Sequence, residues 1–294
     1  MKHHNGDITD EQRRRLTEAL KQSPSFTLAY EDPDFMAEDV LRSMRLGLEL
    51  NKAELLLRRH QIRSSIAVFG SARTQPPEEA EARLASLKKK HKGTTSGEAT
   101  TALRLAEKQV DQSRYYAEAR KFSQIVSKDF IDDNAVDLVI FTGGGPGIME
   151  ASNRGAFDVS APSCGLNITI PMEQQPNPYI TPELCFQFHY FAIRKMHFLM
   201  RAMALVAFPG GFGTMDELFE ALTLVQTRKM QRIPVVLVGS DFWHRAINFD
   251  FLVEEGVISP GDLDLFSIVD TAEKAVAVIY DYYGRSIPKP GEFY

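Results

Sequence analysis

The sequence predicts an α/β fold in which a parallel β-sheet is covered by helices on both faces. Short runs of aliphatic, β-branched and aromatic residues alternate with longer segments of helical spacing along most of the chain. This alternation is typical of parallel sheets, whose strands are buried on both faces. Two of the apolar runs lead directly into glycine-rich segments. Because ligands of such folds bind beyond the carboxyl ends of the strands, both segments are candidate binding loops.

Residues 1–62 are predicted to form an N-terminal helical extension, and residues 63–294 the sheet domain. After an acidic segment, apolar residues recur at helical spacing at Val40, Met44, Leu48 and Leu55. This spacing gives a helix one apolar face to bury. We therefore expect the extension to cover either a subunit interface or the mouth of a binding site.

The first strand is expected at Ile66–Phe69, where a short apolar run ends at Gly-Ser-Ala-Arg. A charged segment at 79–113 follows, and its middle, GTTSGEATT, is small and polar. This composition predicts a solvated insertion of two helical pieces around a mobile break. The helical pattern resumes from Tyr115 and ends before the second strand, Leu138–Phe141.

Further strands and helices complete the predicted alternation. The strands are expected at Gly165–Ile170, Leu184–Phe188, Leu205–Phe208 and Val235–Val238. Helices are expected near 191–202, 214–229 and 271–283. The repeated order of strand and helix is the basis for predicting a parallel sheet.

Composition excludes several classes of protein. With 294 residues, 44% of them hydrophobic, the chain can bury a large core, and its net charge of −5 provides no general attraction for nucleic acid. Two cysteines do not make a disulfide framework, which favours a reducing, cytoplasmic compartment. No signal-like segment and no apolar run of about 18 residues is present, so no membrane association is predicted.

The first glycine-rich segment is Thr142–Glu150, TGGGPGIME. Its glycines permit close approach of a ligand to the main chain, and Pro146 suits a first helical turn. The segment matches neither the G-x-G-x-x-G dinucleotide pattern nor a P-loop, because Ile148 replaces the third glycine and no Lys-Ser/Thr pair follows. A strand-to-helix turn without a ligand remains an alternative.

The second segment, PGGFGT, lies between an apolar run and a helix expected to begin near Thr214. Its glycines can direct several amide N–H groups toward one point at the helix start, which favours a phosphate. Glu217 has two interpretations. Thr214-x-x-Glu217 has the spacing of a capping box, but the glutamate could instead face a more distant part of a bound ligand.

A phosphate site needs a cation, and the pair Arg194-Lys195 lies upstream on the preceding helix. The arginine fork suits a carboxylate or a sugar phosphate, whereas the lysine is a mobile point charge. The alternative is a solvated basic pair on an amphipathic helix. His189 and His197 have no third ligand at useful spacing, so we predict packing roles for them and no metal site.

The combination of GGGPGIMEASNRGA, the Arg-Lys pair and PGGFGTMDE resembles the LOG (Lonely Guy) family. These proteins are nucleoside 5′-monophosphate phosphoribohydrolases, long mislabelled lysine decarboxylases, and they include the cytokinin-activating enzymes of plants. The resemblance covers roughly residues 64–285. It is specific because the basic pair stands at the family's distance from PGGxGTxxE.

The resemblance implies a Rossmann-like, doubly wound fold and a homodimer or higher homo-oligomer with sites near the subunit interface. It implies a nucleosidase that hydrolyses AMP or N6-modified AMP to free base and ribose 5-phosphate, with no organic cofactor. The biological role is then cytokinin biosynthesis or nucleotide salvage. The run AMALVAF lacks an aspartate that many relatives have there, which leaves the substrate preference open.

The resemblance also implies roles for individual residues. The catalytic candidates are Arg194, Glu217 and, in the loop after Ile170, Glu173. The phosphate-binding candidates are Gly210, Gly211, Gly213 and Thr214. The nucleotide-binding candidates are Gly70, Ser71, Gly144, Gly145, Phe191 and Lys195, with Phe191 either stacking on the base or packing in the core.

These residue types fit the chemistry. Departure of a purine leaves an oxocarbenium-like ribosyl centre, which an ionised Glu217 would stabilise while orienting the attacking water. Two alternatives remain. A nucleotide-binding protein without turnover would need the phosphate loop but no carboxylate near the ribose. A decarboxylase would need pyridoxal phosphate on a lysine, and Lys195 is the only lysine near the motifs.

Overall fold

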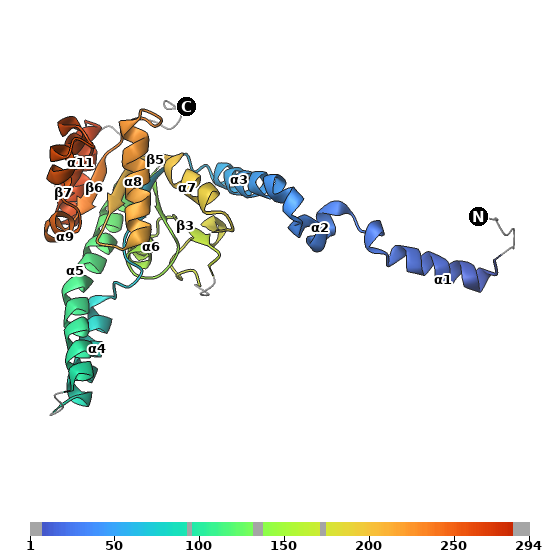
Figure 1. Cartoon of the computed structure of the whole chain (residues 1–294), viewed down its shortest axis with the longest axis horizontal. Helices are drawn as coiled ribbons and strands as arrows, with labels where there is room; N and C mark the ends of the chain where they lie inside the picture. Colours follow the sequence, from blue (N-terminus) through green and yellow to red (C-terminus); the bar gives the residue numbers. More distant parts are fainter. Residues whose placement is uncertain (1–7, 93–95, 132–137, 171–174, 285–294) are drawn as a thin grey trace. The chain divides into compact units, whose positions relative to one another are not determined.

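The computed structural model describes residues 8–92, 96–131, 138–170 and 175–284. A seven-stranded sheet, parallel throughout, has the strand order β4-β3-β2-β1-β5-β6-β7 (Figure 1). The strands are β1 Ser64–Phe69, β2 Leu138–Thr142, β3 Ser163–Ile168, β4 Cys185–Phe188, β5 Ala202–Ala207, β6 Val235–Val238 and β7 Ser267–Val269. The predicted Rossmann-like α/β fold is confirmed.

The strand order places a topological switch point between β1 and β5. The chain proceeds outward from β1 to β4 on one side and then returns to add β5 on the other side of β1. The connections that leave the carboxyl ends of β1 and β5 therefore run in opposite directions. Such a divergence leaves a crevice beyond the carboxyl ends of the strands, which is where ligands bind in open α/β sheets.

The sheet is covered on both faces because its central strands are apolar on both sides. Every residue of β1, β2, β5 and β6 is buried. One face carries a core built by three helices, α5 Gly97–Ile131, α6 Ile148–Asp158 and α11 Ala272–Tyr282. On the other face, Phe69 meets Phe198 of α7 (Phe191–Leu199) at a ring-centroid distance of 4.7 Å, and α8 (Phe212–Gln226) lies in front of the sheet in Figure 1.

The remaining helices vary in length. The α-helices of the sheet domain not yet given are α4 Pro77–Lys90, α9 Ser240–Ala246 and α10 Phe249–Glu254. Short 3-10 helices are η4 Pro182–Leu184 and η5 Pro260–Leu265. Helices α4 and α5 pack along one another in the region predicted as an insertion. The expected break, GTTSGEATT, is helical from Gly97 on, because α5 already begins there, and its residues 93–95 lie outside the described residues.

Strand prediction failed at one edge of the sheet. The six predicted strands are present, most with ends displaced by one to three residues, whereas β7 was missed. All three residues of β7 are only partly buried, and the strand is too short to show an apolar run or an alternation. An edge strand of this length is specified by its pairing with β6 rather than by its own sequence.

The chain divides into two compact units, Met1–Asn51 and Lys52–Tyr294. The described part of the first unit contains α1 Asp10–Lys21, η1 Pro24–Phe26, η2 Ala29–Glu31, α2 Pro33–Ala37, η3 Asp39–Leu41 and the start of α3 Arg42–Arg59. A capping box between Thr9 and Gln12 fixes the start of α1. None of residues 8–51 is buried, and the apolar positions Val40, Met44 and Leu48 are exposed.

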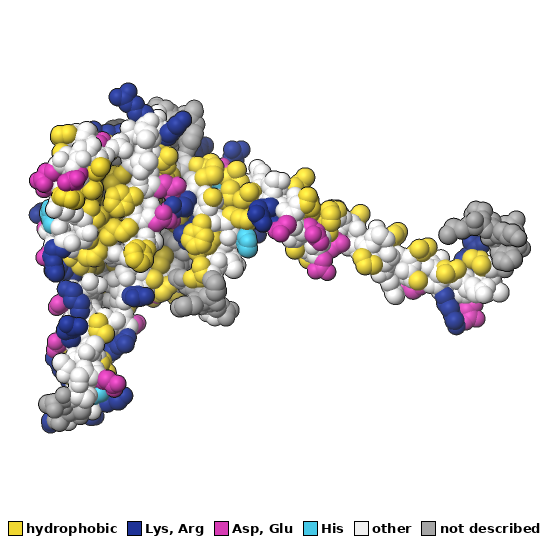
Figure 2. Space-filling view, viewed as in Figure 1, with side chains coloured by type: hydrophobic (Ala, Val, Ile, Leu, Met, Phe, Trp, Pro, Cys, Tyr) yellow, Lys and Arg dark blue, Asp and Glu magenta, His cyan; other side chains and the backbone are white. Residues whose placement is uncertain are grey.

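Over the described ranges, no helix combines the length and the apolarity needed to cross a membrane. Hydrophobic side chains nevertheless gather on the face formed by α7 and α8 (Figure 2). The exposed ones include Phe191, Met196, Phe212 and Phe219. This face borders the cavity described below.

Candidate active site

Three loops meet at the switch point, following β1, β2 and β5. The amide of Ser71, after β1, donates to the carbonyl of Pro209, after β5, at 3.0 Å. The amide of Ile148, after the β2 loop, donates to the carbonyl of Ser71 at 3.1 Å. The two glycine-rich segments are therefore joined through the Gly-Ser-Ala-Arg loop between them.

Close contact between these loops explains two of the glycines. A Cβ on Gly70 would lie 2.6 Å from Cγ2 of Ile148, so the β1 loop has no room for a side chain there. Gly147 has a φ of +73°, and a Cβ would lie 2.3 Å from the carbonyl oxygen of Ser71. Glycine at both positions leaves room for the loops to pack closely, whether or not a ligand is bound.

The loops enclose a cavity of about 690 Å³, which is within the usual size range of small-molecule sites. Eight of the sequence-predicted site residues line it, namely Gly70, Ser71, Arg194, Gly210, Gly211, Gly213, Thr214 and Glu217. Residues from β1, α7 and the start of α8 are thus brought together although they lie far apart in the sequence. Gly144, Gly145, Phe191 and Lys195 are outside the lining, and Glu173 lies outside the described residues.

Gly144 and Gly145 have a structural explanation. The side-chain amide of Asn177 donates to the carbonyl of Gly144 at 3.1 Å and to that of Gly145 at 3.0 Å. The same amide donates to Asn153, which is also bonded to Thr142. These glycines are anchored in a buried polar network beside the cavity, and their neighbour Gly143 is the residue of this loop that lines it.

The amino end of α8 faces the cavity. The helix begins at Phe212 with Gly211 as its N-cap, and its first internal bond joins the amide of Met215 to the carbonyl of Gly211 at 3.0 Å. The earlier amides of a helix have no carbonyl one turn before them. Phe212, Gly213 and Thr214 line the cavity, so the first N–H groups of α8 belong to its wall, and such helix starts favour negatively charged ligands.

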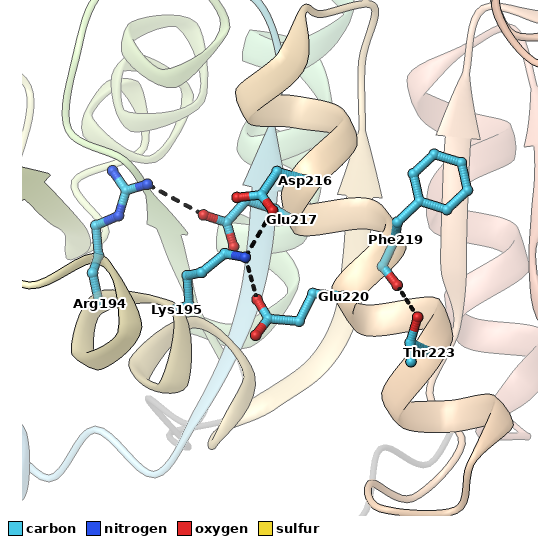
Figure 3. Close-up of polar contacts among 7 residues, drawn as sticks. All are labelled: Arg194, Lys195, Asp216, Glu217, Phe219, Glu220 and Thr223. Carbon is cyan, nitrogen blue, oxygen red and sulfur yellow. Dashed lines mark hydrogen bonds and ion pairs between the residues drawn. The ribbon is translucent and has the colours of Figure 1, made fainter.

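The capping-box interpretation of Thr214-x-x-Glu217 is wrong. The helix starts two residues before Thr214, and no side chain caps it. Glu217 instead accepts a hydrogen bond from Nη2 of Arg194 through Oε1, at 3.2 Å (Figure 3). Because Gly211 can adopt the cap position itself, Glu217 is available to point toward α7.

Arg194 and Glu217 form a buried ion pair, with side chains 14% and 5% exposed. Burial raises the pKa of Glu217 to about 7, against the opposing effect of Arg194. Burial also lowers the pKa of Arg194. Oε2 of Glu217 and Nε of Arg194 are buried and have no hydrogen-bond partner among the described residues. Buried polar atoms without a partner are rare in native structures, and a catalytic role is one of the explanations for them.

Aromatic rings surround the guanidinium. The Cζ atom of Arg194 lies 5.0 Å from the centroid of Phe191 and 5.8 Å from that of Phe198. Phe191 is about half exposed, which contradicts its interpretation as a core aromatic. It packs against the arginine at the edge of the site and does not line the cavity.

Lys195 has a different environment from its neighbour Arg194. Its ammonium pairs with Asp216 at 2.9 Å and with Glu220 at 3.0 Å (Figure 3). Both carboxylates belong to α8, so the pair of cations on α7 meets α8 at successive turns. Lys195 therefore influences the site through its charge and is not part of the cavity wall.

Among the lining residues that sequence reasoning did not single out are Met149, Phe198 and Phe212. Phe198 follows Arg194 by four residues and so shares its face of α7, a spacing that could have identified it. Phe212 is hidden among the glycines of its loop, and its ring is almost fully exposed. Arg73 also lines the cavity, as the only cation of the β1 loop.

The two histidines have packing environments. His197 is buried, with Nδ1 3.3 Å from a carboxylate oxygen of Glu54 and its ring against Phe188. The ring of His189 packs edge-on against Tyr190. Within the described ranges, no three or more His, Cys, Asp or Glu side chains lie together so that they could hold a metal ion.

The chain is similar to known proteins in its sequence. A family model described as "Possible lysine decarboxylase" matches residues 149–279. The cytokinin riboside 5′-monophosphate phosphoribohydrolase LOG3 of Arabidopsis thaliana is 29% identical over 170 residues, which are 53% of this chain and 77% of that protein. LOG1 of the same plant is 29% identical over 154 residues, covering 51% and 70%.

Solved structures with a similar backbone fold include the molybdenum cofactor binding protein of Rippkaea orientalis. It has a TM-score of 0.45 and 13% identity over 76% of this chain and 99% of that one. The Moco carrier protein of Chlamydomonas reinhardtii has a TM-score of 0.44 and 15% identity, covering 76% and 99%. These values are too low to bear on the ligand of this chain.

Proposed function

Starting from the resemblance of this chain to the LOG family, which the sequence relatives confirm, we propose that it hydrolyses the N-glycosidic bond of a purine nucleoside 5′-monophosphate. The substrate is AMP or an N6-modified AMP, and the products are the free base and ribose 5-phosphate. One observation carries the proposal. The buried Arg194–Glu217 pair and the amino end of α8 belong to the wall of a single cavity.

The phosphate would bind at the amino end of α8. A Cβ added to Gly211 or to Gly213 would meet no heavy atom within 4 Å, and neither residue has a positive φ. Glycine is therefore not required there by packing or by backbone conformation, and Gly213 costs the helix about 0.5–1 kcal/mol relative to alanine. A ligand that approaches the main chain explains why both are glycine. A helix end contributes about 0.3–1 kcal/mol to binding a charge, and up to about 2 when partly buried.

The carboxylate of Glu217 would act on the ribose. As the bond between C1′ and the base nitrogen breaks, positive charge develops on the ribosyl ring, and the carboxylate stabilises it. Water adds at C1′, and one of its protons ends on the departing base. Oε2 has no partner among the described residues, so it is the oxygen that would orient this water once the side chain turns toward the cavity. Arg194 holds the other oxygen, and Arg73 adds a cation for the phosphate.

The two alternatives differ from this proposal at specific residues. A protein that only binds nucleotides would gain nothing from a buried carboxylate whose pKa is raised to about 7. A decarboxylase would need an unprotonated lysine. Burial lowers the pKa of Lys195, but its bonds to Asp216 and Glu220 outweigh this and raise it, which keeps the amine protonated and poorly nucleophilic.

The direct test is to incubate the pure protein with AMP and with N6-isopentenyl-AMP and to measure free base and ribose 5-phosphate by chromatography. We expect both products in equal amounts. Binding of either nucleotide without product across the common nucleoside monophosphates would favour the non-catalytic alternative and reject the proposal.

Replacing Gly213 with alanine should separate stability from binding. The helix should gain about 0.5–1 kcal/mol, because nothing lies within 4 Å of the added Cβ. The Michaelis constant for AMP should rise, because the methyl group would occupy the place of a phosphate oxygen. Urea denaturation and steady-state kinetics measure the two effects. An unchanged Michaelis constant would exclude this helix end as the phosphate site.

The pH dependence should report the ionisation of Glu217. We expect kcat/KM for AMP to rise with pH through an apparent pKa of about 7, because the active form is the carboxylate. Lys195 lowers the pKa of Glu217 and Glu220 raises it. Lys195→Met should therefore shift the rise of kcat/KM, the acidic limb of the pH profile, to higher pH. Glu220→Gln should shift it to lower pH.

The substrate phosphate also titrates near pH 6, and the two variants serve as the control for it. Its titration does not depend on residues 195 and 220, so a limb that stays in place in both variants would belong to the substrate. Shifts in opposite directions assign the limb to Glu217.

We also propose that the protein acts as a homodimer or a higher homo-oligomer. The aromatic side chains of Phe191, Phe212 and Phe219 are exposed on α7 and α8 around the cavity, and Phe212 is 96% exposed. Exposed apolar groups gathered beside a site are typical of an interface. Light scattering should give at least twice the mass of one chain, and replacing Phe212 and Phe219 with serine should lower it.

A further inference from the structure

A second cavity, of about 550 Å³, lies at the opposite end of the strands from the candidate active site. Its wall includes Ser64 and Ala202, the first residues of β1 and β5. The candidate active site is built on the carboxyl ends of the same two strands. The second cavity is therefore separate from it, and it shares Met196 with the exposed apolar face of α7 and α8.

The wall of this cavity is rich in methionine. Met196, Met200, Met203 and Met230 line it, together with leucines of α7 and α8. Unbranched, polarisable methionine side chains adapt their shape to an apolar ligand. We call this site the methionine cavity. Its volume is within the range of about 300–1,000 Å³ that is usual for small-molecule sites.

The charges of the wall are unbalanced. Among the described residues of its wall are five cations, Arg63, Lys195, Arg201, Lys229 and Arg232, and the carboxylate of Glu220. Lys195 is neutralised by Asp216 and Glu220. Arg201 is neutralised by Glu54, which accepts from both of its terminal nitrogens at 2.6 and 2.5 Å. Among the described residues, Arg63 and Lys229 have no ion pair and are exposed. The cavity thus combines an apolar wall with uncompensated positive charge.

We propose that the methionine cavity binds a small amphiphilic anion, that is, a molecule with an apolar body and an acidic head group. The apolar body fits the methionine and leucine side chains. The acidic head complements the cations, because an apolar ligand without a charge would leave them unmatched. A molecule of inorganic anion size would leave most of the apolar wall uncovered.

The methionine cavity shares two helices with the candidate active site. On α7, Arg194 lines one cavity and Lys195 the other. On α8, Glu217 lines the candidate active site and Glu220 lines the methionine cavity. Lys195 pairs with Glu220 and also with Asp216, the neighbour of Glu217 (Figure 3). An anion bound against Lys195 competes with these two carboxylates for its ammonium. A ligand at one site can therefore alter the charges that surround Glu217 at the other.

Binding is tested by calorimetric titration of the full chain with octyl sulfate below its micellar concentration. One saturable site per chain is expected, with 1-octanol and inorganic sulfate each binding at least about tenfold more weakly. The double variant Arg63→Met/Lys229→Met should weaken binding by about tenfold, since each exposed ion pair contributes a few-fold in affinity and distant sites add. The matched control, Arg83→Met/Lys89→Met on α4, should bind as the parent does.

The proposal would be overturned if octyl sulfate did not bind saturably, or if the Arg63→Met/Lys229→Met variant bound it as tightly as the parent does. If 1-octanol bound as tightly as octyl sulfate, the proposal that the cavity recognises an acidic head group would also be rejected. Because sulfate could enter the phosphate site instead, the titration is repeated with the Gly213→Ala variant. Loss of binding there would place the probe in the candidate active site and not in the methionine cavity.

A coupling of the two sites rests on the proposed nucleosidase activity and is tested apart from binding. Saturating octyl sulfate should move the acidic limb of kcat/KM to higher pH, as Lys195→Met does, because it withdraws a cation from Glu217. If the protein does not hydrolyse nucleotides, the calorimetric result stands by itself, so the two failures can be told apart.

Discussion

Replacing Glu217 with glutamine should reduce the turnover of AMP by about 10²–10³-fold or more, the range seen when one group that stabilises a transition state is removed. Glutamine keeps the size of the side chain and can still accept a hydrogen bond from Arg194, but it carries no negative charge for the ribosyl centre. AMP should bind at least as tightly, because a carboxylate near the phosphate has been removed. Single-turnover kinetics and calorimetry measure the two quantities.

Asp216→Asn is the matched control for this experiment. Asp216 is the neighbouring acid on α8, but its carboxylate pairs with Lys195 and does not line the cavity. Its loss should change turnover by less than about tenfold, because it acts on Glu217 only through charge. Similar losses in both variants would mean that the chemistry does not depend on the carboxylate at position 217.

Replacing Arg194 with methionine should impair both activity and stability. Removing one partner of a buried ion pair typically costs about 3–5 kcal/mol, because the other charge is left uncompensated. Turnover should fall with it, since Glu217 loses the hydrogen bond that orients it. The unfolding free energy is measured by urea denaturation and the turnover with AMP.

The stability loss should depend on pH in a specific direction. The pKa of Glu217 in the folded protein, about 7, is above its ordinary value of 4.5, so the folded state binds the additional proton. Stability from this group is complete below pH 4.5 and is lost as the pH rises through the folded pKa. Without Arg194, which lowers that pKa, the loss continues to higher pH. The deficit of the variant should therefore be larger at pH 8.5 than at pH 6.

Lys195→Met provides the comparison on the same helix. Lys195 pairs with Asp216, whose side chain is 58% exposed, and exposed pairs contribute about 0–1 kcal/mol. If Lys195→Met lost as much stability as Arg194→Met, the buried pair would not be the source of the effect. The same would follow if the loss in Arg194→Met did not change with pH.

Much of the fold could be predicted because its signals are local. The central strands are buried on both faces, so their sequences are continuous apolar runs that stand out from the helices between them. The three-residue β7 could not be found in this way, because its pairing partner specifies it. The start of α8 was also misplaced, because a glycine N-cap has no side-chain signature.

The site was predictable only in part. Spacing within one segment favoured a capping box for Glu217, and that interpretation was wrong. The correct partner, Arg194, lies 23 residues upstream on another helix, and only the packing of α7 against α8 brings the two together. Gly144 and Gly145 have a structural partner that the sequence did not indicate. Their composition indicated a ligand loop, whereas their carbonyls are bound by Asn177, more than 30 residues away.

The sequence by itself determined the α/β class, the parallel sheet and the two glycine-rich segments, because each depends on residue types within a short window. The tertiary structure decided the rest. It divided the adjacent cations Arg194 and Lys195 between two cavities, and it raised the pKa of Glu217 by burying it. Burial and charge pairing depend on which distant elements pack together, and a single sequence does not contain that information in readable form.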